Sequence, residues 1–272
     1  MAAATGSSGV AMTQEDRVLL QHARHVLENP GLAARITDVI GKPIKMGMGL
    51  LPAKWSEQVN AITKRALETA LNVALATLDK NPQKHSKSML HKIAVTAAGA
   101  GGGAFGLAAL AIELPVSTTI ILRSIADIAR SEKEDLSLPL TRLACLEVFA
   151  LGGRTPKDNS TESGYFMVRA ALARAVTEAA QCIAEKGVAK EGAPVLARLF
   201  AQIANRFGMV VSEKIAAQAV PVVGALGGAL INLAFIDYFQ DIARGHFTVR
   251  RLERTYGAGP VRAEYERVSG WQ

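Results

Sequence analysis

The sequence predicts an all-α protein, a multi-helix bundle with two helical hairpins rich in glycine and alanine. Hydrophobic residues make up 49% of the 272-residue chain and aromatic residues only 5%, so small and aliphatic side chains dominate. Alanine and leucine are among the best helix formers. Apolar residues also recur at helical spacing in most segments, and no pattern of strands alternates with the helices, which argues against an α/β fold.

The N-terminal residues 1–12 predict a disordered tail, because they contain no lysine or arginine and no apolar stretch of a secretory signal. We expect residues 13–272 to form a single helical domain, since a chain of this length can bury a large core.

The first helix is expected over residues 13–29. Thr13 can cap its N-terminus, with Asp16 three residues on in a variant of the capping box, and an Asn-Pro-Gly sequence ends it.

The helices that follow are marked by apolar periodicity and by proline and glycine. A short helix is expected over residues 31–41, and residues 42–52 read as an apolar loop or an interfacial segment. Pro115 is expected to kink or end the helical run before it. Gly152 and Gly153 are expected to end another helix, and the tail from residue 237 is amphipathic and basic. The longer helices are predicted at residues 56–79, 93–112, 116–136, 138–153, 165–187 and 193–214.

Two long apolar runs, residues 93–112 and 215–236, carry no charge. The first contains Gly101, Gly103 and Gly106, which fit the dinucleotide-binding pattern G-x-G-x-x-G. A site of that kind needs a strand before the glycines and a βαβ unit around them. Neither is predicted here, and no P-loop lysine follows. We therefore expect no nucleotide and no other cofactor.

The glycines of both runs instead predict close packing between helices. Small residues recur every four positions, as at Ala98, Gly102 and Gly106, and such stripes let two helix backbones approach closely. A weak internal echo links the runs, because residues 101–113 resemble residues 224–237 and an Asp-Ile-Ala-Arg sequence follows each. The predicted packing residues are Gly99, Gly102, Gly103, Gly106, Gly224, Gly227 and Gly228.

Each run is long enough to cross a bilayer, but small and polar residues make both of them marginal as membrane spans. Three alternatives stay open: a hairpin buried in a soluble bundle, peripheral or shallow membrane attachment, and true spanning. The net charge is +7, and ten basic against four acidic residues lie between Arg35 and Lys92. This excess beside the first run favours contact with an anionic membrane surface. Nucleic acid is not expected, because stacking aromatics and zinc-finger spacing are missing.

The sequence contains no motif for a catalytic nucleophile or a zinc protease, so an enzyme is not favoured. The weak catalytic candidates are Glu113, Asp127 and His246. Glu113 ends an apolar run and could be an acid at a helix boundary, while Asp127 has the spacing of a helical ion pair. No metal site is expected, because His22, His25 and Glu28 drift off one helix face. The two cysteines, Cys145 and Cys182, suggest a reducing compartment and no disulfide framework.

Four arginines near His246 could bind phosphate headgroups, although a solvated helix face is the more ordinary interpretation. They are Arg244, Arg250, Arg251 and Arg254.

Three blocks of the chain together resemble the EcsC protein family: "ELPVSTTIILRSIADIARSEKEDLSLPLTRLACLEVFALGG", "ESGYFMVRAALARAV" and "AVPVVGALGGALINLAFIDYFQDIARGHFTVRRLERTYG". The resemblance extends from Trp55 to Tyr265 with the blocks in matching order. The chain departs from the family form at Lys133, where a glycine is expected before the Glu-Asp pair. This difference affects a turn.

The resemblance implies a bacterial, helical, membrane-associated protein, and it supplies no catalytic residues. The family takes its name from a gene beside an ABC transporter. We therefore expect a non-enzymatic protein on the cytoplasmic side of the bacterial inner membrane, attached peripherally or inserted shallowly, that assists a transporter or another envelope process. A cytoplasmic location is the alternative. Two other functions stay open: a hydrolase-like enzyme with a polar site between helices, and a soluble bundle that binds lipid or an apolar ligand. The oligomeric state is not predicted.

Overall fold

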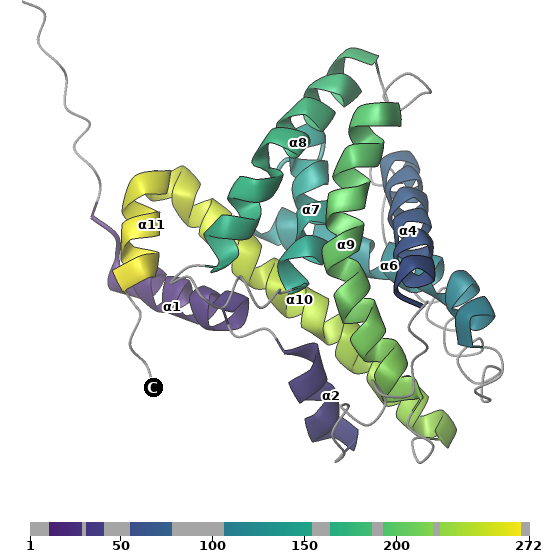
Figure 1. Cartoon of the computed structure of the whole chain (residues 1–272). Coiled ribbons are helices and arrows are strands. Elements are labelled where there is room, and N and C mark those ends of the chain that lie inside the picture. The colour runs from purple at the N-terminus through teal and green to yellow at the C-terminus, as the bar shows by residue number, and fades with distance from the viewer. Residues whose placement is uncertain are drawn as a thin grey trace, which may run out of the picture.

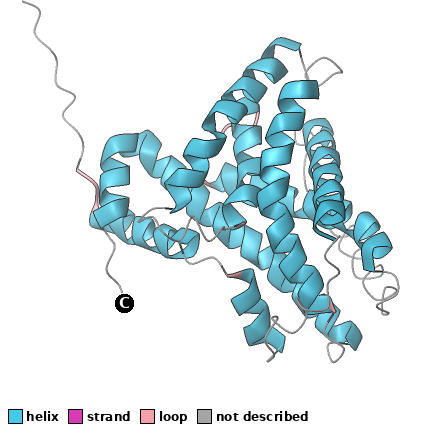
Figure 2. Cartoon of the chain, viewed as in Figure 1, coloured by secondary structure: helices cyan, strands magenta, loops and turns pink. Residues whose placement is uncertain are grey.

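The computed structural model describes residues 11–28, 31–40, 55–77, 106–153, 164–186, 193–219 and 224–267. The described residues form helices and connecting turns with no strand (Figures 1 and 2), so the all-α prediction is confirmed. The predicted segment 42–52, most of the tail 1–12 and most of the run 93–112 lie outside the described residues. The helices are α1 (Gln14–Glu28), α2 (Leu32–Ile40), α4 (Trp55–Thr77), α6 (Gly106–Ser131), α7 (Pro139–Gly152), α8 (Gly164–Lys186), α9 (Ala193–Gln218), α10 (Gly224–Tyr256) and α11 (Ala258–Arg267).

Local sequence signals account for most helix ends. The Thr13 hydroxyl accepts a hydrogen bond from the Asp16 backbone N–H at 3.1 Å, which is the predicted N-cap of α1. Helix α7 ends at Gly152, as predicted, and a Cβ on the next residue, Gly153, would lie 2.1 Å from the Arg206 carbonyl oxygen. Only glycine permits this approach of α7 to α9.

Pro115 does not end a helix, contrary to one of the two predicted outcomes. It lies inside α6, which continues from Gly106 to Ser131. Proline removes the N–H that would bond to the carbonyl four residues earlier, which here belongs to Ala111. Ala111 and its neighbour Ile112 are exposed, so water can bond to that carbonyl and the cost of the proline is reduced.

Helix α7 lies at the centre of the fold and packs against α6, α8, α9 and α10 (Figure 1). Its residues from Leu143 to Gly152 are all buried. Four phenylalanines from three helices meet in this core with ring centroids 4.7–6.1 Å apart, the range of favourable aromatic packing. They are Phe149, Phe207, Phe235 and Phe239.

Helices α6 and α10 run parallel, and the C-terminal half of α6 with the turn after it keeps one register against α10. The Gln240 amide donates to the Ser124 hydroxyl at 2.8 Å, and the Arg250 guanidinium donates to Glu134 just past the end of α6. Both bonds join residues 116 positions apart. The described part of the first echoed block, residues 106–113, lies in α6, and the second block, residues 224–237, lies in α10, so these parts of the internal echo belong to two parallel helices.

The turn after α6 is a Schellman motif with Lys133 at its left-handed position. The Glu134 N–H donates to the Ala129 carbonyl and the Lys133 N–H to the Arg130 carbonyl, each at 3.0 Å, which is the bonding pattern of that motif. Lys133 has φ of 61°, a conformation that glycine adopts without strain. The one noted departure from the family sequence therefore falls on the residue that needs positive φ.

Among the described residues, two glycines that the sequence did not single out make close helix contacts. A Cβ on Gly245 of α10 would lie 2.9 Å from Leu27 Cγ of α1, and a Cβ on Gly208 of α9 would lie 2.2 Å from the Asn60 amide oxygen of α4. A Cβ on Gly228 would meet nothing within 4 Å. Gly106 begins α6, while Gly224 and Gly227 lie in the first turn of α10. The other predicted packing glycines lie outside the described residues: Gly99, Gly102 and Gly103.

The second uncharged run does not form one element. Residues 215–218 complete α9, and residues 224–236 begin α10, so the run includes the connection between two packed helices. Across the described ranges, no helix combines the length and apolar character that a membrane crossing requires.

Candidate functional site

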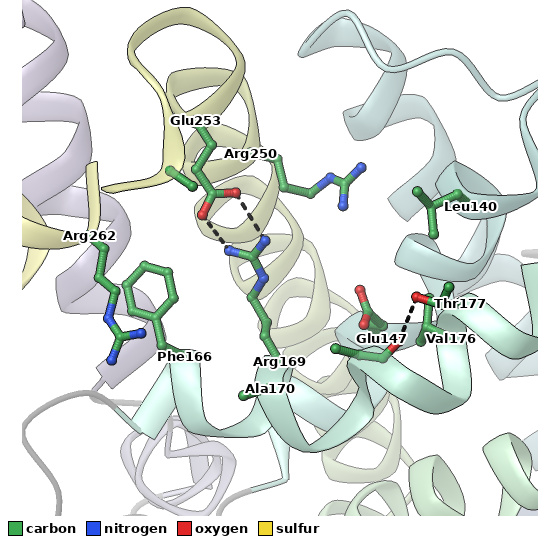
Figure 3. A pocket seen from close by; sticks show the side chains of 12 residues that line it. Leu140, Glu147, Phe166, Arg169, Ala170, Val176, Thr177, Arg250, Glu253 and Arg262 are labelled. Atoms are coloured by element: carbon green, nitrogen blue, oxygen red, sulfur yellow. Dashed lines mark hydrogen bonds and ion pairs between the residues drawn. The ribbon is translucent and has the colours of Figure 1, made fainter. Parts of the chain in front are cut away.

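A pocket of about 370 Å³ lies between α7, α8, α10 and α11 (Figure 3). It opens to the surface, since several of its lining residues are exposed, Ala170, Ala173 and Ala258 among them. Apolar side chains form much of its wall, and charged side chains from all four helices reach it. The lining residues are Leu140, Glu147, Phe166, Arg169, Ala170, Ala173, Val176, Thr177, Arg250, Glu253, Ala258 and Arg262.

Glu147 is the most unusual residue of this pocket. It belongs to the buried helix α7 and is only 7% exposed, yet no described residue hydrogen-bonds or ion-pairs with its carboxyl group. Burial raises the pKa of Glu147 to about 7, although the nearby guanidinium groups of Arg169 and Arg250 act in the opposite direction. Desolvation disfavours the ionised form of a carboxyl group, so Glu147 is protonated in a large part of the molecules at neutral pH.

Arg169 connects the pocket to the polar interior behind it. Its two Nη atoms donate to the two carboxylate oxygens of Glu253 at 2.8 and 3.0 Å, so that α8 and α10 are joined by a bidentate ion pair (Figure 3). Its Nη1 also donates to the Tyr165 hydroxyl at 3.2 Å. Bidentate arginine–carboxylate pairs are geometrically specific, and this one holds the Arg169 guanidinium in place at the pocket wall.

His246 lies behind this pair and is fully buried. Its Nδ1 lies 3.0 Å from the Tyr165 hydroxyl. That hydroxyl already accepts a bond from Arg169, so its own proton is available to Nδ1, and the ring proton of a neutral His246 then stands on Nε2. The pKa of His246 is well below its usual value because of burial and the positive charges of Arg169 and Arg250. No partner for Nε2 exists within the described part of the chain.

Arg250 supports the pocket from α10. Its Nε and Nη2 donate to the Glu134 carboxylate at 2.8 and 3.2 Å, which leaves Nη1 outside that pair. Glu134 is buried and also pairs with Arg254; the hydrogen bonds and charges of these two arginines hold the pKa of Glu134 below its usual value against its burial. The turn after α6 is thereby fastened to the C-terminal half of α10.

The three weak catalytic candidates do not form one site. His246 contributes to the polar interior behind the pocket. Glu113 lies inside α6, not at a helix boundary, and accepts a bond from the fully buried Lys214 at 2.5 Å. Asp127 is exposed and pairs with Arg130, three residues on, at 2.7 Å, which matches the ordinary structural interpretation of this residue.

The four arginines predicted to contact phosphate headgroups have carboxylate partners within the chain. Arg250 and Arg254 pair with Glu134, and Arg251 pairs with Glu132 and Asp16. Arg244 is exposed and pairs with Asp241 at 2.6 Å. Three of the four therefore take part in tertiary ion pairs, which fasten α10 to α1 and to the turn after α6.

A second surface feature lies at the N-terminal ends of α6 and α10. Ile112 is 65% exposed, Leu230 46% and Leu233 56%. The register of 116 positions, extended back from Ser124, places Ile112 level with Gly228. Leu230 is two residues and Leu233 five residues farther along α10. We call Ile112, Leu230 and Leu233 the apolar end. All three lie within the two uncharged sequence runs.

The other reactive or metal-binding groups offer no alternative site. Cys145 is buried in α7, which raises the pKa of its thiol to about 12, and Cys182 is free and partly buried. Glu28 accepts hydrogen bonds from the Tyr165 N–H and the Tyr265 hydroxyl. In the part of the chain that the structure describes, no three His, Cys, Asp or Glu side chains gather to hold a metal ion.

Sequence reasoning missed Glu147, Tyr165 and Arg169, although signals for them existed. Glu147 is a single acid in the apolar stretch "LACLEVFALGG", where an isolated charge on a buried helix indicates a special environment. Tyr165 and Arg169 are four residues apart and so share a helix face. Their connection to His246 spans 81 positions, which no local pattern could reveal.

Comparison with known proteins places this chain in a family. The sequence profile of the EcsC protein family matches residues 19–252. The matched region contains Glu147, Tyr165, Arg169, His246 and Arg250, and it ends just before Glu253 and α11. No match was found among curated proteins or among solved structures. Because the profile spans most of the chain, the protein belongs to the EcsC protein family.

Proposed function

We propose that this protein attaches peripherally to an anionic membrane surface, on the cytoplasmic side of the bacterial inner membrane. In this proposal it assists a transporter or another envelope process and does not itself catalyse a reaction. The observation that carries the proposal is the apolar end. Its large apolar side chains, 46–65% exposed, lie near the N-terminal ends of two parallel helices. Grouped apolar exposure of this kind marks interaction surfaces on soluble proteins.

The position of the apolar end in the sequence supports a lipid partner. It continues from runs that carry no charge, and the segment from Arg35 to Lys92 before the first run has an excess of six positive charges, ten minus four. Apolar side chains and nearby basic residues together favour peripheral binding to anionic bilayers. Assistance to an ABC transporter rests only on the name of the family.

Flotation with vesicles of phosphatidylglycerol and phosphatidylethanolamine tests the attachment. The wild-type protein is expected to float with the vesicles at low salt and to be released in part as salt screens the basic segment. The double variant Leu230→Glu/Leu233→Glu should bind about tenfold more weakly or worse, because each leucine loses the free energy of apolar burial. Both side chains are exposed, so the fold should be preserved.

Two variants with the same chemical change elsewhere provide the control. Val18 on α1 and Met167 on α8 are also exposed, and the glutamate variants Val18→Glu and Met167→Glu should float like the wild type. If the wild type fails to float at low salt, or if all these variants lose binding equally, the membrane proposal is wrong.

A further inference from the structure

The pocket between α7, α8, α10 and α11 has the features of a ligand site that is separate from the apolar end. Its interior holds the Glu147 carboxyl group, 7% exposed and without a partner among the described residues. Burying a polar group without a hydrogen bond is costly, so a ligand that supplies the missing partner is favoured. The apolar wall at the Glu147 end of the pocket, which includes Leu140 and Val176, can contact a short apolar group of the same ligand.

The unused hydrogen-bonding atoms of this pocket are mostly donors. Arg169 uses both Nη atoms on Glu253, whereas Arg250 has Nη1 outside its pair with Glu134. Arg262 on α11 uses only its Nε, on Glu266, and its guanidinium lies over the Phe166 ring. Glu147 adds an O–H donor when it is protonated, as it is in many molecules near pH 7. These groups match a ligand that accepts hydrogen bonds.

The charge of the lining also favours a negative ligand. Three arginines and two glutamates line the pocket. Arg169 pairs with Glu253, while Arg250 and Arg262 pair with Glu134 and Glu266 outside the lining. With Glu147 protonated, the described lining therefore has no carboxylate left for a cationic ligand to pair with. His246, the titratable residue behind the wall, is neutral because its pKa is lowered. An ammonium group beside Glu147 would instead face Arg169 and Arg250, whose charges act on the same carboxyl group.

We propose that this pocket binds a small carboxylate or phosphate monoester that bears a short apolar group, with its oxygens between Glu147 and Arg250 and its apolar group against Leu140 and Val176. On binding, the Glu147 carboxylate takes a proton from solvent and donates it as a hydrogen bond to the anion. Charge-assisted bonds from arginine and a carboxyl O–H are among the stronger hydrogen bonds in proteins.

Isothermal titration calorimetry with sodium hexanoate and with hexyl phosphate tests the proposal, and hexylamine serves as the control of opposite charge. Titrations at pH 7 in two buffers of different ionisation enthalpy measure the protons exchanged. Both anions should bind. Hexanoate, which is ionised at pH 7, should bind with net proton uptake by the protein, because the Glu147 groups that are ionised before binding must take up a proton. Hexylamine should not bind.

Four variants connect the binding to this pocket. Ala173 lines it and Ala171 does not, although both are exposed on α8, so Ala173→Phe should abolish binding and Ala171→Phe should leave it unchanged. Arg262 lies over the Phe166 ring at the other end of the pocket, so Arg262→Gln should leave binding nearly unchanged. Glu147→Gln keeps a donor at this position, so it should retain the anion within a few fold while proton uptake disappears.

The outcomes decide the proposal clearly. Three results would each overturn it: binding of hexylamine in place of the anions, binding without proton uptake by the wild type, or equal effects of Ala171→Phe and Ala173→Phe.

The anion has two possible sources, a free metabolite or a lipid headgroup. If Ala173→Phe also reduces flotation with anionic vesicles, a headgroup is the source; if flotation is unchanged, the ligand is a soluble anion. The proposal does not depend on membrane attachment, because the calorimetry uses no lipid.

Discussion

At the scale of single residues, Glu147 and Lys133 both adopt states that are ordinarily unfavourable. Glu147 places a carboxyl group in the interior without a bonded partner, and Lys133 adopts a positive φ of 61°. Each state costs free energy of folding, on the order of 1–3 kcal/mol for strained backbone. The two costs have different consequences, because the cost at Glu147 depends on pH and the cost at Lys133 does not.

The stability of the protein is expected to depend on pH through Glu147. Its pKa is about 7 in the folded state against 4.5 as the ordinary value, so the folded state holds its proton more tightly. The resulting stabilisation is complete below pH 4.5 and is lost as the pH rises through 7. As the pH rises from 4.5 to 8, the free energy of unfolding of the wild type should therefore fall by about 3 kcal/mol relative to that of Glu147→Gln.

Urea unfolding followed by circular dichroism at both pH values measures this difference. Glu57 is exposed on α4, and the matched variant Glu57→Gln should show almost no such change. The free energies of unfolding of Glu147→Gln and wild type could instead differ by the same amount at both pH values. That result would show that Glu147 ionises in the folded protein as it does in the unfolded chain.

Replacement of Lys133 should relieve backbone strain. Lys133→Gly is expected to stabilise the protein by about 0.5–1 kcal/mol, since glycine adopts positive φ freely but also adds entropy to the unfolded chain. Lys133→Ala retains the strain and should have little effect. Thermal unfolding of both variants tests the explanation, which fails if alanine and glycine give the same change.

At the scale of elements, α10 determines much of the architecture. It is a 33-residue helix that contacts α1, α2, α6, α7, α9 and α11. Its N-terminal half contributes to the apolar end and its C-terminal half to the pocket. Its polar face carries Arg250, Arg251 and Arg254, which bond to Glu132 and Glu134 of the turn after α6. The arginines that the sequence predicts as phosphate contacts therefore also fasten α10 to this turn.

Two glycines of α10 should respond in opposite ways to alanine. A Cβ at Gly245 would lie 2.9 Å from Leu27 Cγ and 3.2 Å from the Ala23 carbonyl oxygen, so Gly245→Ala should push α1 away and destabilise the protein by about 1–3 kcal/mol. Gly228 faces open space, so Gly228→Ala should stabilise it by up to about 1 kcal/mol through helix propensity. Chemical denaturation measures both values. Destabilisation by Gly228→Ala would instead support the sequence-based prediction that this glycine packs against another helix.

At the scale of the whole molecule, the apolar end and the pocket lie apart on the same helix. Leu233 and Arg250 are separated by 17 residues of α10, which corresponds to about 26 Å at 1.5 Å per residue. Sites this far apart and without shared partners generally contribute independently. The protein can therefore contact one partner through the apolar end while its pocket stays accessible.

This separation predicts additive behaviour of the two sites. Leu230→Glu/Leu233→Glu should leave hexanoate binding unchanged, and, for a ligand that is a soluble anion, Ala173→Phe should leave vesicle flotation unchanged. The combined variant should show the sum of the two defects. Coupling greater than about 0.5 kcal/mol in the double-mutant cycle would mean that the two sites communicate or share one ligand.

The sequence alone determined the all-α class, most helix positions, the cap at Thr13 and the helix end at Gly152, because apolar periodicity, caps and glycine act between residues close in the chain. It also indicated Lys133 as an unusual residue, through resemblance to the family. Only the tertiary structure decided what the charged residues do. Arg169 and His246 meet through Tyr165, Arg250 reaches Glu134 across 116 positions, and Glu147 has no described partner. Such effects depend on burial and on pairing between distant segments, and neither is encoded in local spacing.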